Sequence, residues 1–277
     1  MLLSQFSFKE LHSHFYNVRF YDMKRQKEFP EGMVPLGKSE FSFACHQGVA
    51  CFTRCCHKLE IYLYPYDIIR LKNRLGMTSE EFLHNHCGVV QGANPCFPSV
   101  TMLMKRDKGN PCPFLAADGC TIYTDRPSAC RMYPLERAVD RGASGHREGE
   151  YYFLTNHDYC QGHKEEKQWT VKGWVRDQNL LIFNQMEDLW TEMDTIFADS
   201  SIWQGEGAGG PRQQLAFMAC YNIDRFRQYV NDNNILKQYR LDKSKRKLIE
   251  KDDEALLRFA FDWLKVVLAG KPALQRK

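Results

Sequence analysis

The stretch CHQGVACFTRCC, residues 45–56, places four cysteines within twelve residues, and the last two are adjacent. A hydrophobic core does not need four thiols so close together, so the stretch raises the question of what holds them. In extended backbone, neighbouring side chains point to opposite faces. Cys55 and Cys56 therefore reach one centre only where the chain turns sharply. One of them can ligate while the other packs, or the two can serve different centres.

A second group of cysteines follows further along the chain. Cys112, Cys120 and Cys130 lie within PCPFLAADGCTIYTDRPSACRMYP (111–134), and Cys160 follows in HDYCQGH. Clustered thiolates repel one another unless a cation neutralises them, as zinc does with four tetrahedral ligands and as iron–sulfur clusters do. The sequence therefore predicts a metal centre with eight candidate thiolate ligands: Cys45, Cys51, Cys55, Cys56, Cys112, Cys120, Cys130 and Cys160.

The cysteine spacing indicates a metal but does not identify it. C-x5-C-x3-CC and C-x7-C-x9-C contain neither the C-x2-C pair of a zinc knuckle nor the ferredoxin run. Aromatic residues interleave with the cysteines, and an apolar shell excludes water and tunes redox potential. The first hypothesis is an iron–sulfur cluster of the [4Fe–4S] type, with Arg126 and Arg131 as supporting charges. Two centres are possible because eight cysteines exceed the four that one needs, and structural zinc is the alternative.

Composition narrows the class of protein. The chain has 277 residues, 43 % hydrophobic and 26 % charged, as is ordinary for a soluble globular protein. Its net charge of +4 is too weak to indicate nucleic-acid binding. The apolar segment 255–270 is interrupted by charges and cannot span a bilayer, and the first residues lack the basic start of a signal peptide. We therefore expect a cytoplasmic protein with reduced thiols, no nucleic-acid or membrane partner, and an unidentified protein partner.

The pattern along the chain predicts an α-rich fold. An irregular cysteine-rich metal-binding region with short β segments occupies residues 1–165, and a helical C-terminal region, 166–277, packs on it or forms one domain with it. Residues 12–35 suggest a short helix or strand before a turn at 30–32. Helix signals start at Asp67 and stop at Gly76, and a capping box runs from Thr78 to Glu81. The remaining expected elements are strands at 99–105 and 151–155, helices at 181–197, 213–230 and 254–268, and a linker at 204–211.

The remaining residues give weaker indications of function than the cysteine clusters do. His46, His57 and His157 lie close to cluster cysteines, where each could ligate a metal or donate a hydrogen bond to a sulfur. Cys220 lies in a predicted helix, where a free cysteine is usually a small buried residue. No Walker loop, GxGxxG or HExxH motif is present, so nothing assigns a nucleotide, dinucleotide or zincin function.

Three motifs together resemble a known family. FSFACHQGVACFTRCCHKLEIYLYPYDIIRLKNRLG (41–76), CPFLAADGCTIYTDRPSACRMYP and the later Cys160 are similar to the YkgJ-type cysteine-cluster family, a zinc- or iron-chelating domain with a CxxCxxCC signature. The resemblance covers about residues 40–162 and implies that the eight cysteines are ligands. The spacing here departs from that signature and displaces Cys45 and Cys51. Flagellin lysine methylases contain a related cysteine module thought to carry an iron–sulfur centre, so a protein-modifying methyltransferase is a third hypothesis.

Overall fold

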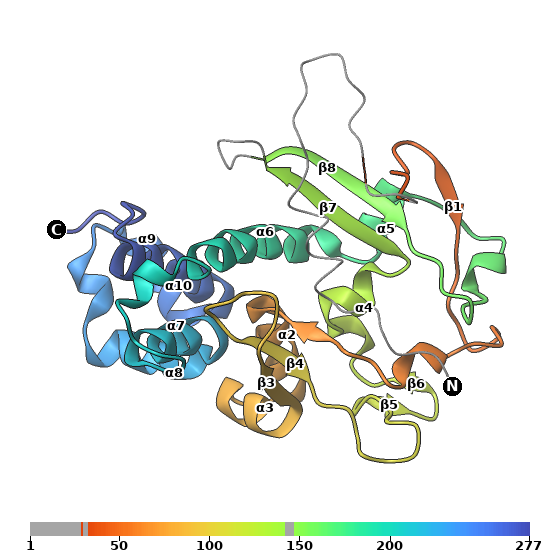
Figure 1. The fold of residues 1–277 in the computed structure, drawn as a ribbon, viewed down its shortest axis with the longest axis horizontal. Coiled ribbons are helices and arrows are strands. Elements are labelled where there is room, and N and C mark those ends of the chain that lie inside the picture. Colours follow the sequence, from red (N-terminus) through yellow and green to blue (C-terminus); the bar gives the residue numbers. More distant parts are fainter. Residues whose placement is uncertain (1–28, 30–32, 142–146) are drawn as a thin grey trace.

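The computed structural model describes residues 29, 33–141 and 147–277, and it confirms an α-rich chain with short strands (Figure 1). The predicted element in 12–35 falls largely outside the described residues. The α-helices are α2 (Pro65–Leu75), α3 (Ser79–His86), α4 (Ser128–Met132), α5 (Val171–Asp177), α6 (Leu180–Phe197), α7 (Pro211–Tyr221), α8 (Ile223–Asp232), α9 (Lys243–Lys251) and α10 (Asp253–Ala269). Short 3-10 helices are η1 (Arg54–Cys56), η2 (Tyr123–Asp125), η3 (Gly162–Lys164), η4 (Ser200–Trp203) and η5 (Ile235–Gln238).

The strands form four small antiparallel sheets. β1 pairs with β9, β2 and β3 flank β4, β5 pairs with β6, and β7 forms a hairpin with β8. Their bounds are β1 (Glu40–Ser42), β2 (Tyr62–Leu63), β3 (Cys87–Val90), β4 (Ser99–Met102), β5 (Leu115–Ala116), β6 (Gly119–Cys120), β7 (Leu135–Arg141), β8 (Arg147–Leu154) and β9 (Gln168–Thr170). Sheets this small bury little by themselves, so the core depends on the helices.

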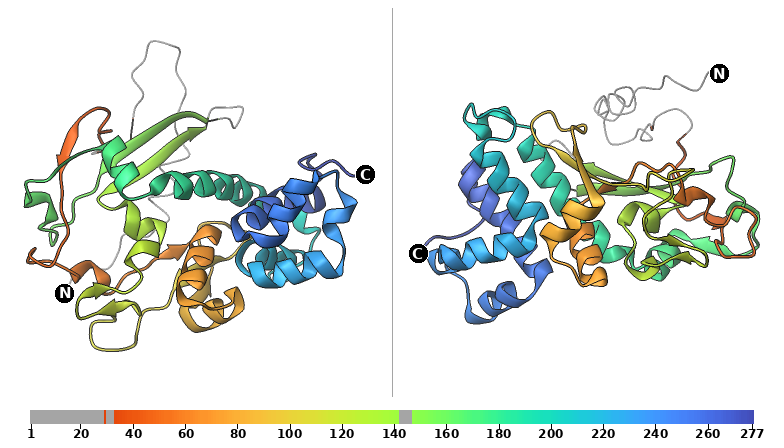
Figure 2. Two further views of the ribbon diagram at one scale, coloured as in Figure 1. Left: turned by 180° about the vertical axis from the view of Figure 1, so that it is seen from behind. Right: turned by 90° about the horizontal axis from the view of Figure 1, so that it is seen from below.

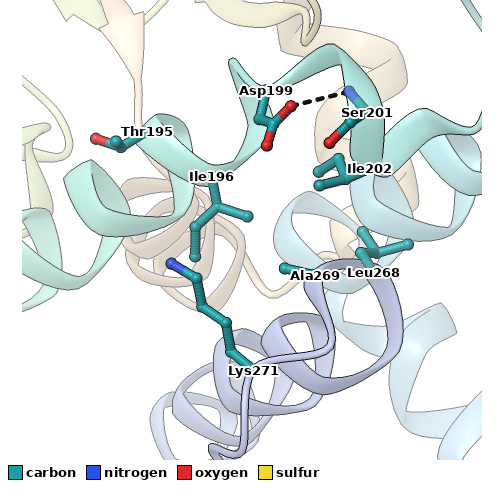
Figure 3. Close-up of a pocket in the computed structure, with 8 residues that line it drawn as sticks. All are labelled: Thr195, Ile196, Asp199, Ser201, Ile202, Leu268, Ala269 and Lys271. Carbon is teal, nitrogen blue, oxygen red and sulfur yellow. Dashed lines mark hydrogen bonds between the residues drawn. The ribbon is translucent and has the colours of Figure 1, made fainter.

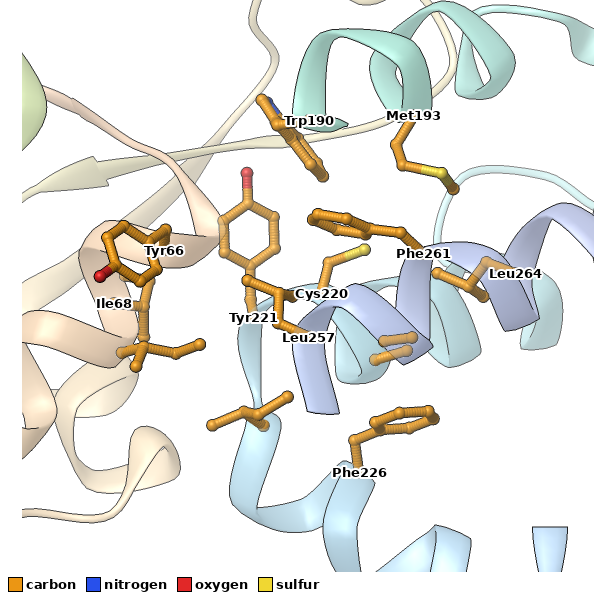
Figure 4. Close-up of a cluster of buried hydrophobic side chains, with 14 of the residues drawn as sticks. Tyr66, Ile68, Trp190, Met193, Cys220, Tyr221, Phe226, Leu257, Phe261 and Leu264 are labelled. Carbon is orange, nitrogen blue, oxygen red and sulfur yellow. The ribbon is translucent and has the colours of Figure 1, made fainter. Parts of the chain in front are cut away.

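One large apolar core joins early and late parts of the chain. Ile68 and Tyr66 from α2 pack into the same cluster as Trp190 from α6 and Phe261 from α10 (Figure 4). In α6 the buried residues recur every three or four positions, which places one apolar stripe of the helix against this core. Cys220 is buried in the same cluster, as expected of a small core residue. The division at residue 165 stays a prediction.

Two local helix signals, one stop and one start, lie where the sequence predicts them, although α2 begins at Pro65, two residues before the predicted Asp67. α2 ends at Gly76, whose φ of 66° is in the left-handed region that favours glycine. At the start of α3, the Thr78 side chain accepts the Glu81 N–H while the Glu81 carboxylate accepts the Thr78 N–H at 2.8 Å. Both predictions are confirmed.

The single helix predicted over 213–230 is wrong, because the chain breaks at Asn222 into α7 and α8. The Asn222 side chain accepts the Arg225 N–H and so caps α8. The same oxygen accepts a hydrogen bond from the Ser79 hydroxyl at 2.8 Å, which ties the break to α3. The apolar period continues through the break, so periodicity alone does not reveal it.

Buried polar contacts attach α2 to its neighbours. Lys72, which is 5 % exposed, pairs with Asp224 at 3.2 Å and with Asp253 at 2.9 Å, and so joins α2 to α8 and α10. At the other end of α2, the buried Asp67 carboxylate accepts the Tyr64 N–H and the Ser128 N–H, both at 2.9 Å. Asp67 therefore fixes the start of α4, the helix that carries Cys130.

None of the helices within the described ranges combines the length and the apolar character needed to cross a membrane.

The Asp67 carboxyl gives a testable pH dependence. Burial raises its pKa to about 7, from an ordinary 3.8, although the two N–H donors oppose this. Between these values the folded protein holds more protons than the unfolded chain, so stability falls as pH rises. The Asp67→Asn side chain is neutral at every pH and keeps only one acceptor oxygen, so the variant should be less stable than the wild type near pH 5. The wild type loses stability as the pH rises, so the difference in free energy of unfolding between the two proteins should narrow by about pH 7.5. Urea denaturation of both proteins at the two pH values measures the gap, and a constant gap would contradict the assignment.

Candidate metal centre

The cysteine loops gather at the end of the molecule away from helices α7–α10. The segment that follows β1, the β5–β6 hairpin, α4 and the η3 segment lie there together, and α6 runs between the two ends (Figures 1 and 2). The thiols fall into two sets according to which thiols raise one another's pKa, and Cys55 acts on members of both sets. The first thiol set is Cys45, Cys51, Cys55 and Cys160, and the second thiol set is Cys56, Cys112, Cys120 and Cys130.

Successive turns shape the loop of the first thiol set. Phe52 donates its N–H to the Val49 carbonyl, Arg54 to the Cys51 carbonyl and Cys56 to the Thr53 carbonyl, so the chain coils back on itself. Thr53 adopts a φ of 63°, a left-handed conformation uncommon for a residue with a side chain.

Two backbone contacts bring the distant Cys160 segment to this loop. The Ala44 N–H donates to the Gly162 carbonyl at 3.1 Å, and the Gln161 N–H donates to the Cys51 sulfur at 3.1 Å. A Cβ atom on Gly162 would lie 2.7 Å from the Ala44 carbonyl oxygen, so only glycine fits this close approach. The contacts place Cys51 and Cys160 beside each other.

The pKa of Cys45 indicates which other thiols lie near it and so belong to the first thiol set. Its pKa is raised to about 11, first by burial of the thiol and then by the thiols of Cys55, Cys51 and Cys160. The residue as a whole is exposed, so Cys45 lies near the surface. The thiols of Cys51, Cys55 and Cys160, from two segments, therefore lie within electrostatic range of the Cys45 thiol.

The second thiol set forms where a hairpin meets the adjacent cysteine pair. The Cys112 N–H donates to the Cys56 carbonyl at 2.8 Å, and the Lys58 N–H donates to the Asn110 carbonyl, so the two segments run side by side. Cys120 lies opposite Leu115 in the β5–β6 hairpin, a few residues from Cys112.

Cys130 completes the second thiol set from α4. Its pKa is raised to about 12, first by burial of the thiol and then by the thiols of Cys112, Cys120 and Cys55. Cys56 likewise has a raised pKa, to which Cys112 and Cys130 both contribute. Three segments that are far apart in sequence thus supply this set.

Cys55 and Cys56 are adjacent in the chain, and one is assigned to each thiol set. A hydrogen bond between their sulfurs couples the ionisation of the two thiols. Cys56 donates a hydrogen bond to Cys55, which lowers the pKa of Cys55 to about 7 and raises that of Cys56. The donated hydrogen bond favours ionisation of Cys55 over ionisation of Cys56. We assign Cys55 to the first set and Cys56 to the second, and Cys55 also raises the pKa of Cys130.

Arg126 is a buried cation beside both thiol sets. It lowers the pKa of Cys45, Cys120 and Cys130. Its guanidinium stacks 3.8 Å above the Tyr123 ring and donates to the Tyr123 carbonyl at 2.6 Å and to Gln178. These contacts hold the charge in place and fit its predicted role as a supporting charge.

Arg131 is bound differently. It donates to the Gln178 carbonyl at 2.7 Å and to the Thr124 carbonyl at 2.6 Å, and it stacks on Phe183. Its main contribution is to fix the backbone between η2 and α4 against α5 and α6. A direct electrostatic role for Arg131 stays a prediction.

The other cysteines and the candidate histidines have separate surroundings. Burial alone raises the pKa of Cys87, and Cys96 donates to the Ala198 carbonyl. His46 lies 3.1 Å from Glu165, and His57 approaches the Thr53 carbonyl. His157 stacks between Tyr133 and Tyr159.

The donor chemistry fits a thiophilic metal. The eleven cysteines are all free, and backbone N–H groups donate to the sulfurs of Cys51, Cys112 and Cys120, as they do to metal-bound thiolates. Across residues 33–141 and 147–277, no three His, Cys, Asp or Glu side chains are arranged to hold a metal ion as they stand. A bound metal would therefore draw the sulfurs of a set closer together.

The segment that carries the eight candidate cysteines is similar to a known protein family. Residues 44–166 match the model of the family CxxCxxCC, described as a "putative zinc- or iron-chelating domain". This segment is therefore similar to that family, and we call residues 44–166 the CxxCxxCC domain. The match includes all eight candidate ligands, and it supports metal binding by zinc or iron without distinguishing them. No curated protein and no solved structure matches the chain.

A cavity of about 320 Å³ lies outside the CxxCxxCC domain, between the end of α6, η4 and the end of α10 (Figure 3). Asp199 at its edge accepts the Ser201 N–H, and Lys271 extends across it. It has no cysteine in its lining and is separate from the thiol sets.

The role of Arg126 can be tested in metal-free protein. Arg126→Gln removes the charge, so the pKa of Cys120 and Cys130 should rise and their alkylation by iodoacetamide should slow by about threefold. Arg126→Lys keeps the charge and should alkylate at nearly the wild-type rate. Mass spectrometry of the two peptides measures the rates, with circular dichroism to verify folding. Equal rates in Arg126→Gln and the wild type would contradict the assignment.

Proposed function

We propose that the CxxCxxCC domain binds two iron–sulfur clusters, one on each thiol set, and that the protein serves as a redox or accessory component of a protein-modifying activity in the cytoplasm. The observation that carries the proposal is the division of eight thiols into two sets of four around one buried arginine. Four cysteine thiolates are the usual ligand set of a [4Fe–4S] cluster.

The surroundings of the sulfurs support a cluster whose potential is tuned by the protein. N–H donors reach Cys51, Cys112 and Cys120, and such bonds are among the main controls of cluster potential. Tyr133, which hydrogen-bonds to Cys160, and Phe43 form an edge-to-face pair with ring centroids 5.6 Å apart. The aromatic side chains limit the access of water to this side of the first thiol set.

Size also favours a cluster over a single ion. Zinc needs four sulfurs about 2.3 Å from one point, so the sulfurs of a set would have to close on that point. A [4Fe–4S] cluster is larger and takes its thiolates at its four corners, so sulfurs on three separate segments can reach it with less movement.

The charge balance follows from the same residues. A cluster or a zinc ion with four thiolates carries about −2 by ligand counting. Arg126, placed beside both sets, offsets part of that charge, and the hydrogen bond from Cys56 lowers the pKa of Cys55, which favours the thiolate form that binds a metal. Bound clusters would supply reversible one-electron transfer.

Structural zinc is the second candidate, and the family description favours it equally. In that case metal binding would supply folding energy and no electron would move. Methyl transfer stays a prediction from the family resemblance.

Metal content after single substitutions tests the two-centre proposal. Anaerobically purified wild type should be brown and contain about eight iron and eight sulfide per chain. Cys51→Ser in the first set and Cys130→Ser in the second should each lose about half of both. Cys220→Ser, a buried cysteine outside both sets, is the matched control and should keep the full content.

Several outcomes would contradict the proposal. A colourless wild type with stoichiometric zinc would establish the structural alternative. Full iron content in Cys51→Ser and Cys130→Ser would remove these residues from the ligand set. Four irons in the wild type, all lost in both variants, would indicate a single centre.

A further inference from the structure

Positive charge is concentrated on the surface around α9. Residues 237–251 contain seven lysines and arginines against two side-chain carboxylates, and residues 270–277 contain three basic residues and no acidic side chain. We call the lysines and arginines of these two segments the basic surface. The whole chain has a net charge of only +4, so the residues outside the two segments are together net negative.

Backbone hydrogen bonds bring the two segments together. The Arg240 N–H donates to the Gln275 carbonyl at 2.8 Å, and the Lys277 N–H donates to the Gln238 carbonyl at 3.0 Å. α9 begins three residues after Arg240, at Lys243. Figure 1 shows α9 and the C-terminus at the end of the molecule opposite the cysteine loops. The basic surface is therefore separate from the thiol sets.

The lysines of α9 form a row on its exposed face. Lys243, Lys247 and Lys251 are four residues apart, which places them on one face of the helix with about 5–6 Å between successive Cβ atoms. All three are exposed. Leu248, next to this row, is 56 % exposed, whereas Ile249 is buried in the core. α9 thus presents three cations and one apolar side chain to the solvent.

The carboxylates near this surface are engaged in other contacts. Asp242 accepts the Lys245 N–H at 2.7 Å and caps α9, and Asp252 caps α10. Glu192 pairs with Lys265 at 2.8 Å. Within the part of the chain that the structure describes, no ion pair joins a carboxylate to a lysine or arginine of the basic surface.

These cations do not stabilise the helix that carries them. Apart from its cap Asp242, α9 has no acidic residue in its first turn, and cations there oppose the helix dipole, whose N-terminal end is positive. Like charges four residues apart on a helix also destabilise it. A negatively charged partner would relieve both effects, so the charge pattern favours a role in binding over a role in folding.

We propose that the basic surface binds a short acidic segment of a partner protein, with its carboxylates on the lysine row of α9 and an apolar side chain against Leu248. From Lys243 to Lys251 the row is about 12 Å long, at about 1.5 Å per residue, which suits a few carboxylates of one segment. Charge complementarity of this kind provides specificity and fast association. The inference does not depend on which metal the thiol sets bind.

Two other anionic partners fit the surface less well. A single-stranded nucleic acid would stack its bases on exposed aromatic rings, and no large aromatic side chain is exposed in residues 237–277. A helix that lies on a membrane needs a broad apolar face, whereas Leu248 is the one exposed apolar side chain of α9.

The test compares two peptides that differ only in charge. One is a fluorescein-labelled peptide of glutamates with a central leucine, and the other has glutamine in place of every glutamate. Fluorescence anisotropy with the full-length, metal-loaded protein should show the glutamate peptide binding at least about tenfold more tightly at low salt, with an affinity that falls as salt is added. Equal affinities, or tighter binding of an oligothymidylate of equal charge or of phosphatidylserine vesicles, would overturn the proposal.

Variants test the location. Lys247→Gln, in the middle of the row, should weaken binding of the glutamate peptide by about threefold without lowering the melting temperature, because it removes like-charge repulsion from α9. Leu248→Ala should weaken binding by about threefold and leave its salt dependence unchanged. Lys172→Gln, at an exposed lysine of α5, is the matched control and should bind as the wild type does. Unchanged affinity in both Lys247→Gln and Leu248→Ala, or an equal loss in Lys172→Gln, would overturn the proposed surface.

Discussion

The thiol loops can lie close together only if positive charge offsets the repulsion among their ionised sulfurs. Cys45, Cys56 and Cys130 each have a raised pKa to which neighbouring thiols contribute, so ionising several of them together is costly without a cation. Arg126 lowers the pKa of thiols in both sets and is held by Tyr123 and Gln178. A single arginine does not neutralise eight thiolates. A metal is the cation that completes the balance, and it would join loops that are far apart in the sequence.

The rest of the fold supplies the frame for these loops. α2 is anchored to α8 and α10 through Lys72 and to the start of α4 through Asp67, so the helical core determines where Cys130 lies. The Cys160 segment is placed by backbone bonds to residues that follow β1, and β1 itself pairs with β9. The cysteine region and the C-terminal helices are therefore mechanically connected.

Much of this could be predicted from sequence, for identifiable reasons. The stop of α2 and the capping box of α3 are local signals, and the structure has them where the residues indicate. The break at Asn222 was missed because it depends on a contact with Ser79, far away in sequence. The eight cysteines could be named, but not their division into sets, because that depends on which loops meet.

The central claim is that two sets of four thiols each hold an iron–sulfur cluster. Anomalous diffraction at the iron absorption edge, from crystals grown without oxygen, tests it most directly. We predict two iron peaks, one surrounded by Cys45, Cys51, Cys55 and Cys160 and the other by Cys56, Cys112, Cys120 and Cys130. An anomalous signal at the zinc edge alone, or no metal peak within bonding distance of these sulfurs, would contradict the account.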